Sequence, residues 1–67
     1  MEDMIFNLLM EKAKNKFPNS SIIPLYHKTW RDCFRHIHDD IFNMYQLYYF
    51  VDDSDDTHCE CLDFNKA

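Results

Sequence analysis

The absence of glycine is the feature that most limits how this chain can fold. Glycine is the residue that most readily adopts positive φ angles, which many tight turns require. The turns must therefore be built from Asn, Asp, Ser or Pro, which favour turns through side-chain hydrogen bonds or a fixed φ angle. Such residues cluster in three places, at residues 17–21, 38–40 and 52–56. The first two predicted turns divide the chain into an N-terminal, a middle and a C-terminal segment, and the third lies within the C-terminal segment.

The length of 67 residues predicts a single small domain that spans residues 1–67. Hydrophobic residues make up 46% of the chain and aromatic residues 16%, a composition that excludes a disordered tail. No apolar run approaches the ~18 residues needed to cross a bilayer, and the N-terminus is acidic where a secretory signal is basic. We therefore expect a cytoplasmic protein that does not interact with a membrane.

A chain this short usually needs a stabiliser in addition to its core. The free energy gained by burying its apolar surface nearly cancels the entropy lost on folding, so small domains often add disulfides, a metal ion or a partner subunit. The three cysteines form an odd set, and Cys59 and Cys61 are too close in one segment to bond readily to each other. Disulfides are therefore not expected, which leaves a metal ion or a partner.

Residues 3–16 have the pattern of an amphipathic helix that Asp3 caps and Pro18 ends. The apolar residues at helical spacing are Phe6, Leu9, Met10, Ala13 and Phe17. The next segment, residues 21–26, is predicted to be an extended connector or an edge strand, because Pro24 cannot donate a backbone hydrogen bond.

Residues 29–32 have the form of a capping box, with Asp32 in the position usually held by Glu. Apolar side chains then recur at helical spacing, at Trp30, Cys33, Phe34 and Ile37. This pattern predicts a short second helix that ends near His38.

Residues 42–51 are mostly aromatic and aliphatic, and an acidic turn separates them from residues 57–64, which predicts a β-hairpin. The expected fold class is therefore α+β, with an N-terminal amphipathic helix, an extended connector, a short second helix and a C-terminal antiparallel β-hairpin.

The first strand of the predicted hairpin carries apolar groups on both faces, so both faces need to be covered. A single layer of helices can cover one face, and we expect the other to meet a second subunit or another protein. The residues predicted to bind this partner come from the aromatic strand and the acidic turn: Tyr45, Tyr48, Tyr49, Phe50, Asp52, Asp53, Asp55 and Asp56.

The charges are unevenly distributed along the chain. Residues 1–36 carry +2 and residues 37–67 carry −7, which together give the net charge of −5. An acidic C-terminal half disfavours direct binding of nucleic acid, which relies on Lys and Arg. We therefore predict a non-enzymatic accessory or regulatory protein that binds another protein or itself, as a homodimer. The alternative is an acidic mimic of nucleic acid, of the phage or mobile-element type, that inhibits a protein that binds DNA or RNA.

Cys33, His36, Cys59 and Cys61 have the composition of a zinc site, since two come from the predicted second helix and two from one strand face. His38 and His58 are spare candidates. No Cys-x-x-Cys pair is present, and cysteine is also a common core residue, so neither a metal nor a cofactor is expected. A small zinc-stabilised domain remains the second alternative.

Cysteine and histidine pairs also raise the question of nucleophilic catalysis. His58 and Cys59 are adjacent in a predicted strand and so point to opposite faces. A domain this small offers no evident substrate pocket, and no enzymatic activity is expected.

Overall fold

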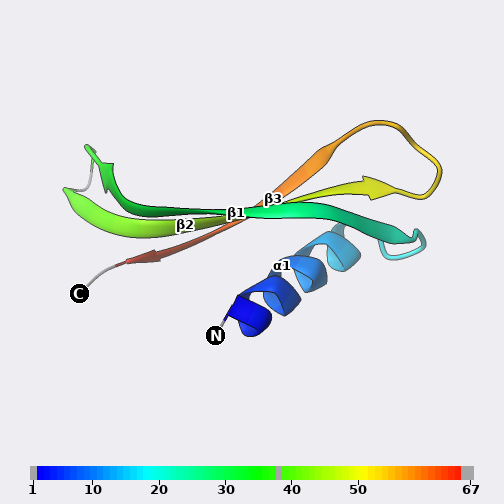
Figure 1. The fold of residues 1–67 in the computed structure, drawn as a ribbon, viewed down its shortest axis with the longest axis horizontal. Coiled ribbons are helices and arrows are strands. Elements are labelled where there is room, and N and C mark those ends of the chain that lie inside the picture. The colour runs from blue at the N-terminus through cyan, green and yellow to red at the C-terminus, as the bar shows by residue number, and fades with distance from the viewer. Residues whose placement is uncertain (1, 38, 66–67) are drawn as a thin grey trace.

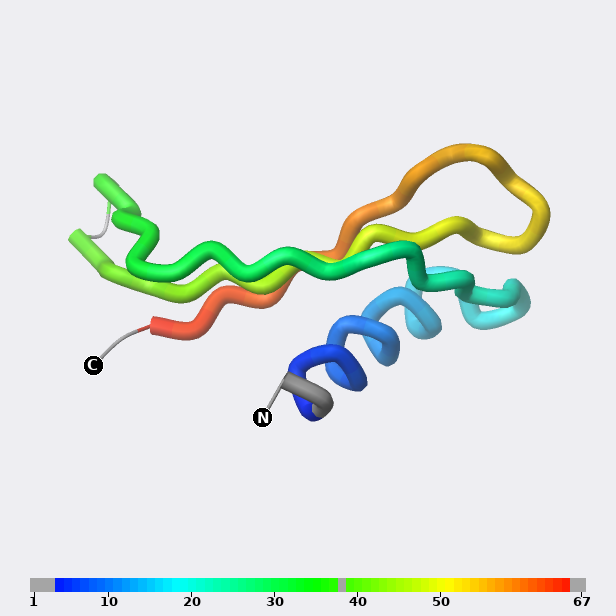
Figure 2. Tube along the Cα trace, in the orientation of Figure 1, coloured from blue at the N-terminus to red at the C-terminus, as the bar shows by residue number. Residues whose placement is uncertain are grey.

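In the described part of the chain, the fold is a single helix that lies across one face of a three-stranded antiparallel sheet (Figures 1 and 2). The computed structural model describes residues 2–37 and 39–65. In order along the chain, the elements are helix α1 (Glu2–Lys16) and strands β1 (Ile22–Arg35), β2 (Asp40–Val51) and β3 (His58–Asn65). The strands form a meander in which β2 lies between β1 and β3.

The predicted layout of an α+β fold with a connector and a second helix is wrong. The segment assigned to the connector and the second helix is one long edge strand, β1. The alternative that residues 21–26 form an edge strand agrees with this, and Pro24 is tolerated there because the outer edge of β1 needs no backbone donor. The predicted end of the second helix at His38 lies outside the described residues.

Two β-bulges in β1 explain why this strand resembles a helix in sequence. The register of β1 against β2 shifts between Pro24 and Tyr26 and again between Trp30 and Cys33. A bulge inserts one extra residue, so side chains three positions apart point to the same face, as they do on a helix. Asp32, the last residue of the predicted capping box, lies in the second bulge with a φ angle of 57°.

Aspartate takes the left-handed backbone positions that glycine occupies in most proteins, as the absence of glycine predicts. Asp32, Asp39 and Asp52 have φ angles of 57°, 51° and 53°. Asp52 also joins the ends of two strands, because its N–H donates to the carbonyl of Ser21 at 2.9 Å and its Oδ1 accepts from the N–H of Ser21 at 2.7 Å. These hydrogen bonds fix the start of β1 against the end of β2.

The core lies between α1 and the face of the sheet that α1 covers. Its fully buried side chains are Leu9, Ala13, Leu47 and Tyr49. The helix predicted over residues 3–16 and the pairing of the two C-terminal strands are both present. The predicted cap at Asp3 lies outside the residues whose side chains the structure describes.

Candidate functional site

The face of the sheet opposite α1 is not covered by any element within residues 2–37 and 39–65 (Figure 1). Successive side chains of a strand point to opposite faces, so Leu47 and Tyr49 face the helix while Gln46 and Tyr48 face away. We call this second surface the open face. The residues of the open face used below are Ile23, Tyr26, Lys28, Trp30, Gln46, Tyr48, Phe50, Cys59 and Cys61.

Several large aromatic side chains lie on the open face. The ring of Tyr26 stacks on that of Tyr48, with centroids 4.7 Å apart and an interplanar angle of 21°. Ile23, Tyr26 and Trp30 are 45%, 50% and 47% exposed. Isolated exposed apolar residues are common, but a contiguous exposed patch of large side chains is typical of an interaction surface.

Lys28 lies among these aromatic rings. Its Nζ is 5.7 Å from the ring centroids of both Tyr26 and Tyr48 and 6.0 Å from that of Trp30. Each such cation–π contact is worth about 0.5–1 kcal/mol at an exposed site. The ammonium group is therefore held over the apolar patch, away from the ends of the sheet.

Hydrogen bonds fix the polar groups of the open face. Trp30 Nε1–H donates to Oε1 of Gln46 at 3.0 Å, and the hydroxyl of Tyr48 donates to the same oxygen at 3.2 Å. Nε2 of Gln46 donates to Sγ of Cys61 at 3.6 Å. A network of this kind holds the rings in one arrangement before any partner binds, which lowers the entropy lost on binding.

The residues predicted to bind a partner do not all lie on one surface. Tyr48 and Phe50 belong to the open face, as the hypothesis requires. Tyr45 and Tyr49 lie on the helix-covered face, and Tyr49 is 0% exposed, so it is not available to a partner. The aromatic part of the predicted set is thus divided between the two faces of β2.

The contribution of β1 to the open face was missed. Ile23, Tyr26, Lys28 and Trp30 are absent from the predicted set, because this segment was assigned to a connector and a helix. Two aromatic residues and a lysine alternate with a period of two at Tyr26, Lys28 and Trp30. This alternation is the signal that favours a strand here.

The four aspartates of the predicted set, Asp52, Asp53, Asp55 and Asp56, lie between β2 and β3. We call residues 52–57 the acidic loop. This loop rises on the side of the sheet away from α1, at one end of the open face (Figures 1 and 2). All four aspartates are exposed, and within the described chain no ion pair involves them.

The candidate zinc ligands do not come together. Cys33 lies in β1 and His36 in the turn after it, so the helical face that was to carry both does not exist. Cys59 and Cys61 do share one face of β3, with their sulfur atoms 3.9 Å apart. Among residues 2–37 and 39–65, no three His, Cys, Asp or Glu side chains are placed to hold a metal ion. The spare candidate His38 lies outside these ranges.

Burial raises the pKa of the Cys59 thiol, and the hydrogen bond with Cys61 raises it further. A thiol with a raised pKa is protonated at neutral pH and is therefore a weak nucleophile and a weak metal ligand. This makes the sulfur atom of Cys59 a poor starting point for catalysis or for zinc.

Removal of metal ions is expected to leave the protein folded. Two thiols on one strand supply half of the four ligands that a structural zinc ion needs. Dialysis against EDTA should therefore change the melting temperature by less than about 1 °C, as measured by circular dichroism. A fall of several degrees that added zinc reverses would contradict this and favour the zinc-stabilised alternative.

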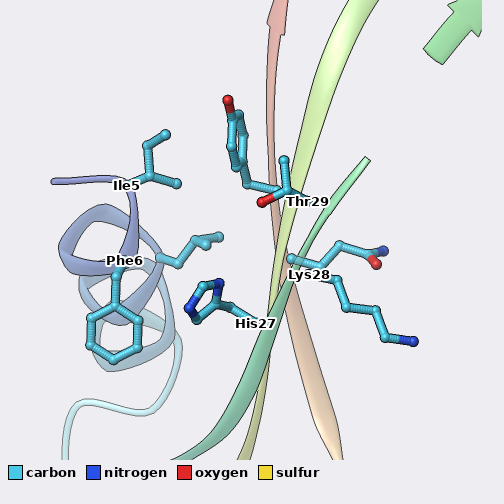
Figure 3. Close-up of a pocket in the computed structure, with 8 residues that line it drawn as sticks. Ile5, Phe6, His27, Lys28 and Thr29 are labelled. Carbon is cyan, nitrogen blue, oxygen red and sulfur yellow. The ribbon is translucent and has the colours of Figure 1, made fainter. Parts of the chain in front are cut away.

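A small and a larger hollow lie on the helix side of the sheet. The first is a niche of about 10 Å³ between α1 and β1, large enough for about one water molecule. Phe6 of α1 lies against His27 across it, with ring centroids 6.3 Å apart, while Lys28 projects from the strand away from the helix (Figure 3). The second is a groove of about 320 Å³ lined by Met4, Ile5, Leu8, Asn43, Tyr45 and Phe64.

Neither hollow has the chemistry of an active site. The niche is too small for a substrate, and the groove is apolar apart from the side chains of Asn43 and Tyr45. A hydrolytic or transfer site needs a nucleophile or a general base with a second group that orients it. The lining of these two hollows therefore does not point to a catalytic site.

No helix within the described residues has both the length and the apolar character required to cross a membrane. No protein-family model, curated protein or solved structure significantly matches the chain. Its function is therefore inferred from its own residues, and the open face is the surface that they single out.

Proposed function

We propose that this chain is a small non-enzymatic accessory or regulatory protein that binds another protein chain through the open face. The observation that carries this proposal is that the half-exposed side chains of Ile23, Tyr26 and Trp30 share one face of the sheet with Tyr48, on which the ring of Tyr26 stacks. Tyr and Trp are the residues that most often dominate the binding energy of protein interfaces. Their fixed arrangement means that little side-chain entropy remains to be lost when a partner docks.

A protein partner is favoured over a nucleic acid because of charge. Aromatic rings around a lysine can also act as a stacking platform for single-stranded bases. Such platforms combine the rings with a positively charged groove that tracks the phosphates, whereas the acidic loop stands at one end of this face. With a net charge of −5, the chain repels a polyanion and does not attract one.

Mimicry of nucleic acid by the acidic loop is less well supported. The loop holds four aspartates within five residues, and Asp52 is bound to Ser21. Each strand of a duplex carries one charge per ~3.4 Å over many turns, so the loop reproduces only a short stretch of that array. Mimicry also assigns no role to the exposed aromatic side chains.

Photo-crosslinking from the open face tests the proposal. With benzoylphenylalanine in place of Trp30, irradiation of the cells that produce the protein should yield a covalent adduct with another polypeptide. The matched control carries the same residue in place of Asn15, which is exposed on α1. An adduct from position 30 that is at least about tenfold more abundant than from position 15 is expected, measured by immunoblot and identified by mass spectrometry. Equal yields, or none, would contradict the proposal.

A further inference from the structure

We infer that the partner of the open face is a second copy of this chain, docked face to face so that Lys28 of each copy meets the acidic loop of the other. This inference rests on the proposed function, because it names the occupant of the same face. Three observations support it. These are the unpaired charges of the face, their positions along the strands, and the area of the surface.

The open face carries a cation and, at one end, the anions of the acidic loop. Neither has an oppositely charged group beside it in the described part of the chain. In the described part of the chain, Lys28 contacts three aromatic rings but no carboxylate. Arg35, another cation of β1, is already bound to Asp63 at 2.7 Å. The exposed carboxylates of Asp53, Asp55 and Asp56 likewise have no ion pair in this part of the chain. An apolar partner would bury Lys28 without an anion, which is costly, whereas a carboxylate beside apolar groups would compensate it.

Lys28 and the acidic loop of the same copy are too far apart to meet. Lys28 is paired in register with Gln46, and the acidic loop begins at Asp52, six residues further along. At about 3.3 Å per residue, this separation is roughly 20 Å. The two groups can therefore neutralise each other only between copies.

A two-fold axis that runs between the two sheets, parallel to them and perpendicular to their strands, brings Lys28 and the acidic loop together. If the axis passes over β2 between Tyr49 and Phe50, Gln46 of one copy lies at the same level as Asp53 of the other. Lys28 then lies beside the partner's acidic loop at both ends of the interface. The apolar side chains nearest the axis are Ile23, Tyr26, Tyr48 and Phe50. The contact is self-complementary, as a symmetric dimer requires, and it gives two sheets about 10 Å apart with an apolar centre and charged ends.

The area of the face matches that of a small dimer. Three strands about 4.8 Å apart and eight residues long give a flat area on the order of 400 Å² per copy. Because side chains project from this flat area, a dimer buries on the order of 1,000 Å² in total, which is the lower limit for a specific interface. The chain itself exposes 5042 Å², compared with roughly 4,500 Å² for a compact monomer of this mass. We therefore expect a weak dimer with a dissociation constant in the micromolar range.

Sedimentation equilibrium of the full chain between about 1 and 500 µM tests for self-association. The mean mass should rise from 8.2 kDa toward twice that value. Tyr26→Ala and Trp30→Ala should each weaken the dimer about 30-fold, as expected for an interface residue worth about 2 kcal/mol. The matched control is Phe34→Ala, which removes an exposed ring from the opposite face and should change the dissociation constant less than about twofold.

A charge-swap experiment tests the arrangement. Lys28→Glu places like charges together at both ends of the homodimer, and so does the combination Asp53→Lys, Asp55→Lys and Asp56→Lys. Each variant alone should be monomeric at 100 µM and low salt. An equimolar mixture should form a heterodimer, because both ends then bring opposite charges together. Both sites are exposed, and a wild-type circular dichroism spectrum confirms that each variant is folded.

The outcomes separate this inference from the proposed function. A wild-type chain that stays monomeric at 500 µM, or a mixture that does not associate, overturns the docking of two copies as described. If position 30 still crosslinks to a different protein in that case, the proposed function stands with another occupant. If the chain is monomeric and position 30 gives no adduct, both are overturned.

Discussion

Truncation of Leu47 to alanine is expected to lower the free energy of unfolding by about 3 kcal/mol. Leu47 is fully buried at the centre of β2, where it packs with Leu9 and Ala13 of α1. Replacing a fully buried leucine removes apolar contacts and leaves a cavity that its neighbours fill only in part. A domain of 67 residues has roughly 3–10 kcal/mol of stability in total, so this one change should remove between about a third and nearly all of it.

The matched control is Leu25→Ala, the same substitution at an exposed leucine of β1. It should cost less than about 1 kcal/mol, because little apolar surface returns to water. Urea unfolding followed by circular dichroism measures both variants at one fixed protein concentration, since a dimer makes apparent stability depend on concentration. Equal losses for Leu47→Ala and Leu25→Ala would show that the core does not lie between α1 and β2.

The helix and the C-terminal hairpin were predictable because their local signals agree with one another. Apolar residues recur at helical spacing up to Phe17, and Pro18 then prevents the helix from continuing. In the hairpin, a run of aspartates separates a segment rich in aromatic and aliphatic residues from a second short segment that begins at Thr57. No competing pattern occurs in either segment, so sequence and structure agree there.

Strand β1 was not predictable in the same way, because its bulges interrupt the alternation that identifies a strand. The bulge after Trp30 places Trp30 and Cys33 on one face, which is also the spacing of a helix. Thr29 and Asp32 add an apparent capping box, although in the structure the N–H of Asp32 donates to Oδ1 of Asn43. Pairing with β2 outweighs these local preferences, and a single sequence does not reveal that pairing.

The open face could be predicted only in part from the sequence. Both faces of β2 are apolar, so the need for a second cover follows from the sequence, but which tyrosines lie under the helix does not. Polarity alone predicts the wrong face of β3 as the covered one, because Glu60 lies on the covered face beside Tyr49. The burial of this carboxylate under the helix is explained by its hydrogen-bond and ion-pair partners.

Tyr49 and Glu60 form a buried hydrogen-bonded pair. The hydroxyl of Tyr49 donates to Oε2 of Glu60 at 2.6 Å, and Nζ of Lys16 lies 3.5 Å from the same oxygen. Both Tyr49 and Glu60 are buried. Burial raises the pKa of the Tyr49 hydroxyl above its ordinary value near 10, and the hydrogen bond to the carboxylate and its negative charge raise it further.

The raised pKa of Tyr49 predicts that the protein loses stability in alkali. Above pH 10 the unfolded chain loses the Tyr49 proton while the folded chain keeps it, so the unfolded state binds fewer protons and stability falls as pH rises. The expected contribution is about 1.4 kcal/mol per pH unit between pH 10 and the higher folded-state pKa. Below pH 10 the contribution to stability is fully present.

Tyr49→Phe should remove this part of the pH dependence and also lower stability at pH 7 by about 1–3 kcal/mol, because the buried carboxylate of Glu60 loses its hydrogen-bond donor. The matched control is Tyr26→Phe, which removes a hydroxyl from a half-exposed ring and leaves the buried pair intact. Urea midpoints at pH 8, 10 and 11 measure the slope. The wild type and Tyr26→Phe should lose stability together, and Tyr49→Phe should lose less between pH 10 and 11. Identical slopes for the two variants would show that the proton of Tyr49 is not held in the folded state.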